Sequence, residues 1–402
     1  MLLKGLKVLE LGTAISVAYC CRLLADLGAE VVKIEKPLAG DEVRCQGPFI
    51  DDIPDKEKSI PFLFLNANKF GVTINIEKMS GAAIIKDLLK DFDIGVESYR
   101  QEFLEQVGLD YESVKRSYPR LVMTSILPYG NDDKFRNYKA YDINVSALSG
   151  INMIIGEPGR RPLNFPYCSL VSGASAAGAT LAAILAEESI GEGDHVDISK
   201  IEVMADLVYD ISIASAWGMG KPFKRAGYRG AQYPYPFTML PVKDGYVTIT
   251  FLGARMQEWW ESFLAILGNP DWSKEPRYQN LEAMGIEYPE EVDALLKPLM
   301  EKYTRDELFS LCKEKRLPVM PVRNPREAME DPHFKEQRKF YQKVYRSDVG
   351  ELIFPGPPFK MAVPCGVRHA PPKLGEHNET ILAKYLGFSS KKLMDLQKEG
   401  II

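Results

Sequence analysis

Histidine is scarce in this chain: there are four among 402 residues, and none of the four follows the spacing of a metal-binding motif. A motif such as His-Glu-x-x-His would place two imidazole groups on one face of a helix, where both can ligate zinc. The six cysteines are scattered without a Cys-x-x-Cys pair, as is typical of reduced thiols in the cytosol. The sequence therefore predicts no metal site and no disulfide framework.

Positive charge is not in excess either. Asp and Glu outnumber Lys and Arg by 55 to 50, and the net charge is -5. Nucleic-acid binding requires clustered Lys and Arg that neutralise phosphates, and no such cluster occurs. We therefore exclude nucleic acid as the main partner. A small anionic ligand is compatible with this composition, because a few basic side chains can converge in one pocket.

Long hydrophobic runs are also missing. The apolar stretch 170–186 is shorter than the roughly 20 residues that a membrane span requires, and it is rich in small and hydroxyl residues. The first twelve residues read as a strand with an early charge at Lys4, and they lack the apolar stretch and cleavage site of a signal peptide. We expect a cytoplasmic protein that makes no membrane contact.

The glycine-rich signatures of nucleotide-binding enzymes are missing as well. After the first predicted strand, residues 12–16 read GTAIS, without the G-x-G-x-x-G pattern that brings backbone amides onto a pyrophosphate. No Walker loop and no G-x-S-x-G elbow occurs. Glu35 ends the next predicted strand, near the distance of a ribose-binding acid. A dinucleotide enzyme is therefore kept as an alternative, and it predicts that NAD is retained on purification.

Alternating strands and helices dominate the first part of the chain. Ser80 is expected to cap a helix that runs to residue 92, and a helical pattern extends from about 200 to 220. Such a succession predicts an α/β fold with a parallel sheet and right-handed crossovers. The predicted strands lie at 6–12, 30–37, 94–98, 121–126 and 191–199.

The composition changes at 221–240, where Pro, Tyr and Gly interrupt every periodic pattern and indicate a linker. Beyond it, Asp244-Gly245 predicts a hairpin. Thr304 and Glu307 predict a capping box for the following helix. A chain of 402 residues exceeds the usual size of one hydrophobic core, so we expect two domains.

A run of Ser, Gly and Ala begins at Ser169 and continues to about residue 180. Small side chains let the backbone approach closely, either to another helix or to a ligand. The side chain at the start of this run is therefore of special interest.

Seven segments of the chain are informative as an ordered set: 3–12, 24–44, 66–69, 94–126, 141–150, 191–199 and 370–382. They begin with LKGLKVLELG and end with APPKLGEHNETIL. In this order they resemble the family III CoA-transferases, and the resemblance covers nearly the whole chain. Any one segment would be weak support, but seven in the same order are strong.

The resemblance implies a fold and an assembly. Family members have a Rossmann-like large domain built from both chain ends, which here corresponds to 1–220 and 331–402. A smaller α+β domain, here 221–330, lies between these segments. Two chains interlock like two rings, so the resemblance also implies an interlocked dimer.

The resemblance also implies a chemistry, in which CoA moves between carboxylic acids. A catalytic aspartate attacks the acyl thioester and forms a mixed anhydride, and then an aspartyl-CoA thioester. The CoA thioester is a substrate, and no permanently bound cofactor is implied. Lys36 stands where the family has an arginine. The implied contacts to CoA are Thr13, Ala14, Ile15, Lys36, Lys69, Ser98, Tyr99, Lys139 and Tyr141.

The family's nucleophilic aspartate begins a D-x-x-x-G pattern, and in this chain that position is Ser169, in SLVSG. A serine hydroxyl is essentially un-ionised at neutral pH and requires an adjacent base, and no histidine lies in the neighbouring segments. An acylated serine would also be an ordinary ester, which is a poorer acyl donor than an anhydride. No intact catalytic residue is therefore predicted.

A racemase branch of the family pairs the same aspartate with a histidine, whose place is taken here by Tyr141. Stereoinversion requires two differently placed bases, so racemase activity is not expected. Asp142 is a weak substitute for the missing carboxylate, and it keeps open the alternative of a self-sufficient transferase.

Heteromeric members of the family suggest how a chain without the nucleophile can persist. We therefore expect a homologous, aspartate-containing subunit as the partner, with an acyl-CoA and a carboxylic acid as substrates of the complex. A second alternative is a non-catalytic CoA-binding or scaffold protein. Nothing in the residues themselves specifies the acyl donor or acceptor.

Overall fold

The chain forms two compact units, and the computed structural model describes residues 1–131, 134–208, 225, 227–229 and 233–402. The first unit comprises 1–149, 165–207 and 332–402, so it takes in both chain ends. The second unit comprises 150–164 and 208–331. Residues 150–164 differ from the sequence-based division, because they pack with the later segment: the Gly227 N–H donates to the Gly156 carbonyl.

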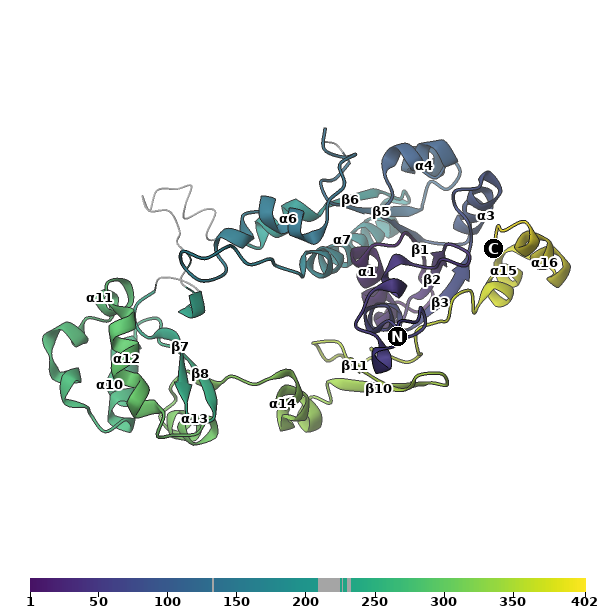
Figure 1. Ribbon diagram of the computed structural model, residues 1–402. Coiled ribbons are helices and arrows are strands. Elements are labelled where there is room, and N and C mark those ends of the chain that lie inside the picture. Colours follow the sequence, from purple (N-terminus) through teal and green to yellow (C-terminus); the bar gives the residue numbers. More distant parts are fainter. Residues whose placement is uncertain (132–133, 209–224, 226, 230–232) are drawn as a thin grey trace. The chain divides into compact units, whose positions relative to one another are not determined.

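A six-stranded sheet forms the centre of the first unit (Figure 1), and all of its strand pairs are parallel. Its strand order is β3-β2-β1-β4-β5-β6, which is the order of Rossmann folds. The α/β class with a central parallel sheet is therefore confirmed. The strands are β1 (Lys7–Leu11), β2 (Glu30–Glu35), β3 (Lys69–Thr73), β4 (Ile94–Glu97), β5 (Val122–Leu127) and β6 (His195–Ser199).

Helices cover both faces of this sheet, because neighbouring side chains of a strand point to opposite sides. Val8 of β1 packs in one cluster with helices α1 (Ile15–Leu27) and α7 (Cys168–Ile190). Leu9 packs on the opposite face. That second face is covered by α3 (Met79–Leu89), α15 (Asn378–Leu386) and α16 (Ser390–Lys398).

The start of α3 differs from the sequence-based expectation. Ser80 was expected to cap this helix, but the N-cap is Lys78 and Ser80 lies inside the first turn. The helix begins earlier because the preceding turn already closes, with the Lys78 N–H donating to the Asn75 carbonyl. A Cβ at Gly81 would lie 2.0 Å from that same carbonyl oxygen, so a glycine is needed there.

The packing of α7 against α1 explains why the sequence of α7 is rich in small residues. A Cβ at Gly173 would lie 2.6 Å from the Ser16 carbonyl oxygen of α1, so the close approach is to another helix. At 23 residues, α7 extends beyond the apolar stretch 170–186 at both ends, and by length and composition alone it could cross a membrane. It packs instead against α1 and β5, where Thr180 and Thr124 join their hydroxyls at 2.7 Å.

The chain returns to the first unit after residue 331. A β10–β11 hairpin is followed by α15 and α16. The His377 N–H donates to the Gly71 carbonyl of β3, which ties the C-terminal segment to the sheet edge. The remaining elements of this unit are α2 (Ile60–Asn66), α4 (Gln101–Val107), α5 (Tyr111–Lys115), α6 (Asp142–Leu148), α8 (Lys200–Asp206), β10 (Tyr341–Arg346) and β11 (Gly350–Pro355).

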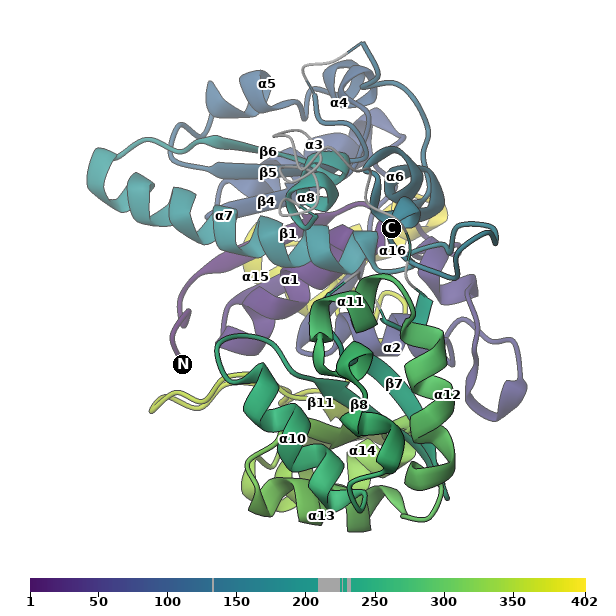
Figure 2. The ribbon, with the colours of Figure 1, turned by 90° about the vertical axis from the view of Figure 1, so that its left-hand side faces the viewer.

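The second unit packs helices around a three-stranded antiparallel sheet (Figure 2). The predicted hairpin at Asp244-Gly245 and the capping box of Thr304 and Glu307 are both confirmed. Most of the predicted helix 200–220 and part of the predicted linker lie outside the described residues. The elements are β7 (Phe237–Val242), β8 (Gly245–Thr250), α10 (Met256–Ile266), α11 (Leu281–Ile286), α12 (Pro289–Met300), α13 (Arg305–Glu314), β9 (Val319–Pro321) and α14 (Pro325–Glu330).

Candidate active site

A pocket of about 400 Å³ lies beyond the carboxyl ends of β1, β2 and β4. The strand order reverses between β1 and β4, and ligands of open α/β sheets bind at such a switch point. Thr13, Lys36 and Tyr99 line this pocket, and all three were predicted from the sequence to contact CoA. The structure thus brings together residues from three separate loops.

The loop after β1 explains how these residues meet. Gly12 has a φ of +113°, and a Cβ on it would lie 2.6 Å from the Ser98 hydroxyl. Glycine therefore lets the loop after β1 touch the loop after β4. Ala14 is the N-cap of α1 and Ile15 is its first residue, so both follow directly on Thr13.

Lys69 lies in a different environment from the one expected of a CoA ligand. Its ammonium group lies 2.7 Å from a carboxylate oxygen of Glu10, and it donates to the Ala18 carbonyl and the Asn66 side chain. The side chain is fully buried. Contact between Lys69 and CoA stays a prediction, and this geometry gives it no support.

Lys69 belongs to a group that we call the inner charge cluster: Glu10, Lys33, Asp41 and Lys69. Lys33 joins Glu10 at 2.8 Å and Asp41 at 2.6 Å, and all of these side chains are at most 1% exposed. Burial raises the pKa of Glu10, but the two ammonium groups outweigh burial and hold that pKa below its ordinary value. The cluster is a closed set of charges that stabilises the loop at the pocket.

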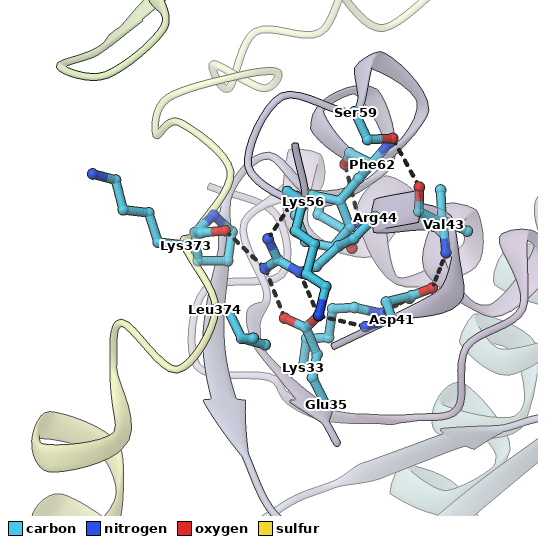
Figure 3. Close-up of polar contacts among 12 residues, drawn as sticks. Lys33, Glu35, Asp41, Val43, Arg44, Lys56, Ser59, Phe62, Lys373 and Leu374 are labelled. Atoms are coloured by element: carbon cyan, nitrogen blue, oxygen red, sulfur yellow. Dashed lines mark hydrogen bonds and ion pairs between the residues drawn. The ribbon is translucent and has the colours of Figure 1, made fainter. Parts of the chain in front are cut away.

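Figure 3 shows the neighbouring contacts of Arg44, which follows β2. Its guanidinium group donates to both carboxylate oxygens of Glu35, at 2.7 and 2.9 Å, and to the carbonyl of Pro372. Arg44 therefore fixes the loop after β2 against the C-terminal segment. Lys36, which lines the pocket, is exposed instead, and it pairs with Glu77 at 2.8 Å.

A second group of polar side chains surrounds Ser169, and we call Asp142, Ser169 and Lys200 the serine cluster. The Ser169 hydroxyl donates to Asp142 Oδ1 at 2.6 Å, and the Ser169 N–H donates to Asp142 Oδ2 at 3.0 Å. The Lys200 ammonium donates to the same hydroxyl at 3.0 Å. The Lys200 and Asp142 charges are 4.0 Å apart.

Local structure explains this convergence, because each of the three residues starts a helix. Asp142 is the first residue of α6, Ser169 the second of α7 and Lys200 the first of α8. The N-cap of α7, Tyr167, offers no side-chain hydrogen bond. The Asp142 carboxylate instead accepts a first-turn N–H of α7, so a carboxylate lies beside the Ser169 hydroxyl.

Burial sets the protonation of the cluster. It lowers the pKa of Lys200, against the opposing effect of Asp142. Burial also raises the pKa of the neighbouring Cys168 thiol to about 11, so this thiol is protonated at neutral pH. The chemically available groups are thus a hydroxyl, a carboxylate and an ammonium group.

Lys139 and Tyr141, two more predicted CoA contacts, precede Asp142 and are both exposed. They do not line the 400 Å³ pocket. Lys200 was missed by the sequence analysis. Its position directly after strand β6 could have indicated a site residue, but a single Lys at that position does not show that it contacts Ser169. Among the described residues, no group of His, Cys, Asp and Glu is arranged to hold a metal ion.

Comparison with known proteins identifies CoA-transferases that are similar to this chain over nearly its whole length. The chain is 28% identical to succinyl-CoA:(R)-benzylsuccinate CoA-transferase subunit BbsE of Thauera aromatica, over 96% of this chain and 94% of that protein. It is 27% identical to (R)-2-hydroxy-4-methylpentanoate CoA-transferase of Clostridioides difficile, over the whole length of both.

A solved structure agrees with these sequence relatives. The crystal structure of a CAIB/BAIF family protein from Brucella suis superposes with a TM-score of 0.84 at 27% identity, covering 95% of this chain and 99% of that one. The profile of CoA-transferase family III matches residues 3–378. The chain therefore belongs to CoA-transferase family III, as its sequence motifs predicted.

Proposed function

We propose that this chain is one subunit of a heteromeric CoA-transferase and that a homologous subunit supplies the nucleophilic aspartate. The observation that carries the proposal is the hydroxyl of Ser169, the second residue of α7, at the sequence position where the family has its aspartate. A relative named as a subunit, at 28% identity over nearly the full length, supports the same assignment. The interlocked arrangement of two chains is part of this proposal.

The chemistry of acyl transfer supports a separate nucleophile. Transfer in both directions requires an acyl carrier whose derivatives are reactive, and a carboxylate provides one as an anhydride and as a thioester. An ester on Ser169 would be too stable to return its acyl group to CoA efficiently. In the complex, this chain contributes the second large domain and the interface, with a CoA pocket at Thr13, Lys36 and Tyr99.

For the substrates we propose succinyl-CoA as donor and (R)-benzylsuccinate as acceptor, in the anaerobic degradation of toluene. The name of the Thauera aromatica relative supports this pair. Other relatives are named for different carboxylic acids, among them glutarate and D-citramalate, so the wider class is CoA transfer between carboxylic acids.

The test is to purify the chain alone and together with an aspartate-containing homologue encoded in the same genome. We expect the pair to form benzylsuccinyl-CoA from succinyl-CoA, and the isolated chain to form none. Native mass spectrometry should show two different chains in the complex. Robust CoA transfer by the isolated chain would contradict the subunit assignment.

Asp142 favours one alternative, a self-sufficient transferase in which Asp142 is the nucleophile. Its carboxylate is held at the start of α7 by the Ser169 N–H and hydroxyl, and its side chain is 23% exposed. Trapping with hydroxylamine during turnover would then place the modification on Asp142. The variant Asp142→Asn would abolish transfer by the isolated chain.

A further inference from the structure

The serine cluster contains a base and a cation for Ser169, which the sequence did not reveal. A nucleophilic hydroxyl requires a base within hydrogen-bond reach and a third group that orients the pair. The Ser169 hydroxyl donates a hydrogen bond to Asp142 Oδ1 at 2.6 Å, and the Ser169 N–H donates one to Asp142 Oδ2 at 3.0 Å. The base is therefore both close to the hydroxyl and fixed in direction.

Lys200 adds positive charge at the oxygen that would attack. Its ammonium group lies 3.0 Å from Ser169 Oγ, and 4.0 Å from the Asp142 carboxylate. In the part of the chain that the structure describes, that hydroxyl is its one hydrogen-bond acceptor. The N-terminus of the 23-residue helix α7 also favours negative charge at this place.

We propose that Ser169 is a nucleophile in its own right and that this chain hydrolyses acyl-CoA thioesters through an acyl-serine intermediate. In the first step, Ser169 Oγ forms a bond to the acyl carbon and its proton passes to Asp142. The carbon–sulfur bond breaks, and CoA leaves as a thiol after it takes that proton. Lys200 stabilises the negative charge that develops on the oxygen.

Water completes the reaction in a second step. Asp142 accepts a proton from a water molecule, whose oxygen attacks the ester carbon. The ester bond breaks, and Ser169 recovers its proton from Asp142. The sum is acyl-CoA plus water to carboxylic acid plus CoA, with every proton accounted for. This activity goes beyond the proposed transfer function, because it needs neither an aspartate nucleophile nor the partner subunit.

Two neighbouring side chains show why the inference falls on Ser169. The Cys168 thiol has its pKa raised to about 11 by burial and points its hydrogen toward backbone carbonyls. Ser172, one turn further along α7, is fully buried and has no hydrogen-bond partner among the described residues. The Asp142 side chain is 23% exposed, whereas Ser169 and Lys200 are buried, so the acyl group has to reach Ser169 from the side of Asp142.

The experiment uses the full chain without a partner, with succinyl-CoA and butyryl-CoA as probes. We expect thiol release above the spontaneous rate and an acyl adduct on Ser169, located by peptide mass spectrometry after acid quenching. Ser169→Ala should remove the adduct, and Asp142→Asn should slow thiol release by about 10²- to 10⁴-fold. Lys200→Met should also slow it, and Lys200→Arg should restore part of the rate.

The matched control is Ser172→Ala, a buried serine in the same helix, which should leave the rate unchanged. Circular dichroism establishes that each variant is folded. A folded wild-type chain with neither thiol release nor an adduct would overturn the inference, as would an adduct on Asp142. Failure of the subunit assignment would appear separately, as benzylsuccinyl-CoA formed by the isolated chain.

Discussion

The two charged clusters of the first unit contain the same kinds of groups but differ in how completely these groups are paired. In the inner charge cluster, Lys33 has two carboxylates within 2.8 Å and no exposed surface. In the serine cluster, Lys200 has one carboxylate at 4.0 Å, and that carboxylate is partly exposed. Closed pairing is typical of a structural role, whereas an open arrangement leaves groups for a ligand or a reaction.

The pKa shifts do not separate the two clusters in the same way, because burial also lowers the pKa of Lys69, although Glu10 opposes this shift. Burial lowers the pKa of Lys33, but Asp41 and Glu10 outweigh burial and raise that pKa above its ordinary value. Burial prevails at Lys200 and lowers its pKa. The distinction between the clusters therefore rests on how closely the charges are paired, which is 2.6–2.8 Å in the inner charge cluster and 4.0 Å between Lys200 and Asp142.

The largest effect is expected from Lys33→Ala. The change leaves Asp41 buried without its ammonium partner, and breaking a buried pair in this way costs about 3–5 kcal/mol of unfolding free energy. Guanidinium unfolding of the full chain, with and without the substitution, measures this loss of unfolding free energy. If Lys33→Ala costs less than a surface variant, the inner charge cluster is not the structural element described above.

A carboxylate that lacks a cation gives the next largest effect. Burial raises the pKa of Glu97 to about 7, although the Ser125 hydroxyl and the Tyr99 N–H oppose the shift. The native state therefore holds a proton that the unfolded chain has lost, and stability falls as the pH rises from about 4.5 through 7.

We expect this loss to reach about 3 kcal/mol for a shift of this size, because one pKa unit corresponds to about 1.4 kcal/mol. Glu97→Gln, which removes the titration, should flatten the dependence between pH 5 and 8. Unfolding curves of the wild type and the variant, recorded at pH 5 and pH 8, measure this dependence. An unchanged slope in the variant would assign the dependence to other groups.

A smaller loss is expected from Lys200→Met. The Asp142 carboxylate keeps the Ser169 N–H and hydroxyl as donors and is partly exposed, so it is not left stranded. We expect a loss of about 1 kcal/mol, the contribution of one hydrogen bond. A loss as large as that of Lys33→Ala would remove the distinction between the two clusters.

The smallest effect is expected from Lys36→Ala. Lys36 and Glu77 form an ion pair at 2.8 Å, but both side chains are about half exposed and stay in contact with water. Such surface pairs contribute about 0–1 kcal/mol. The same unfolding measurement serves as the baseline for the other variants. A lower affinity for CoA in this variant, measured by calorimetry, would support the predicted pocket.

The sequence by itself predicted five of the six strands of the central sheet, because period-two and helical patterns report which residues must be buried. It missed β3, which is only five residues long. It also determined the capping box at Thr304, which depends on residues three apart. Family motifs directed attention to Ser169 and to Thr13, Lys36 and Tyr99, three residues that line the switch-point pocket.

Only the tertiary structure decided which charges are structural and which are open. Lys33 and Lys69 resemble surface lysines in the sequence, but the strand faces turn both into the core beside Glu10. Asp142, Ser169 and Lys200 stand far apart along the chain and meet because three helices begin at one place. Local patterns contain no information about such long-range contacts, which depend on how the helices pack.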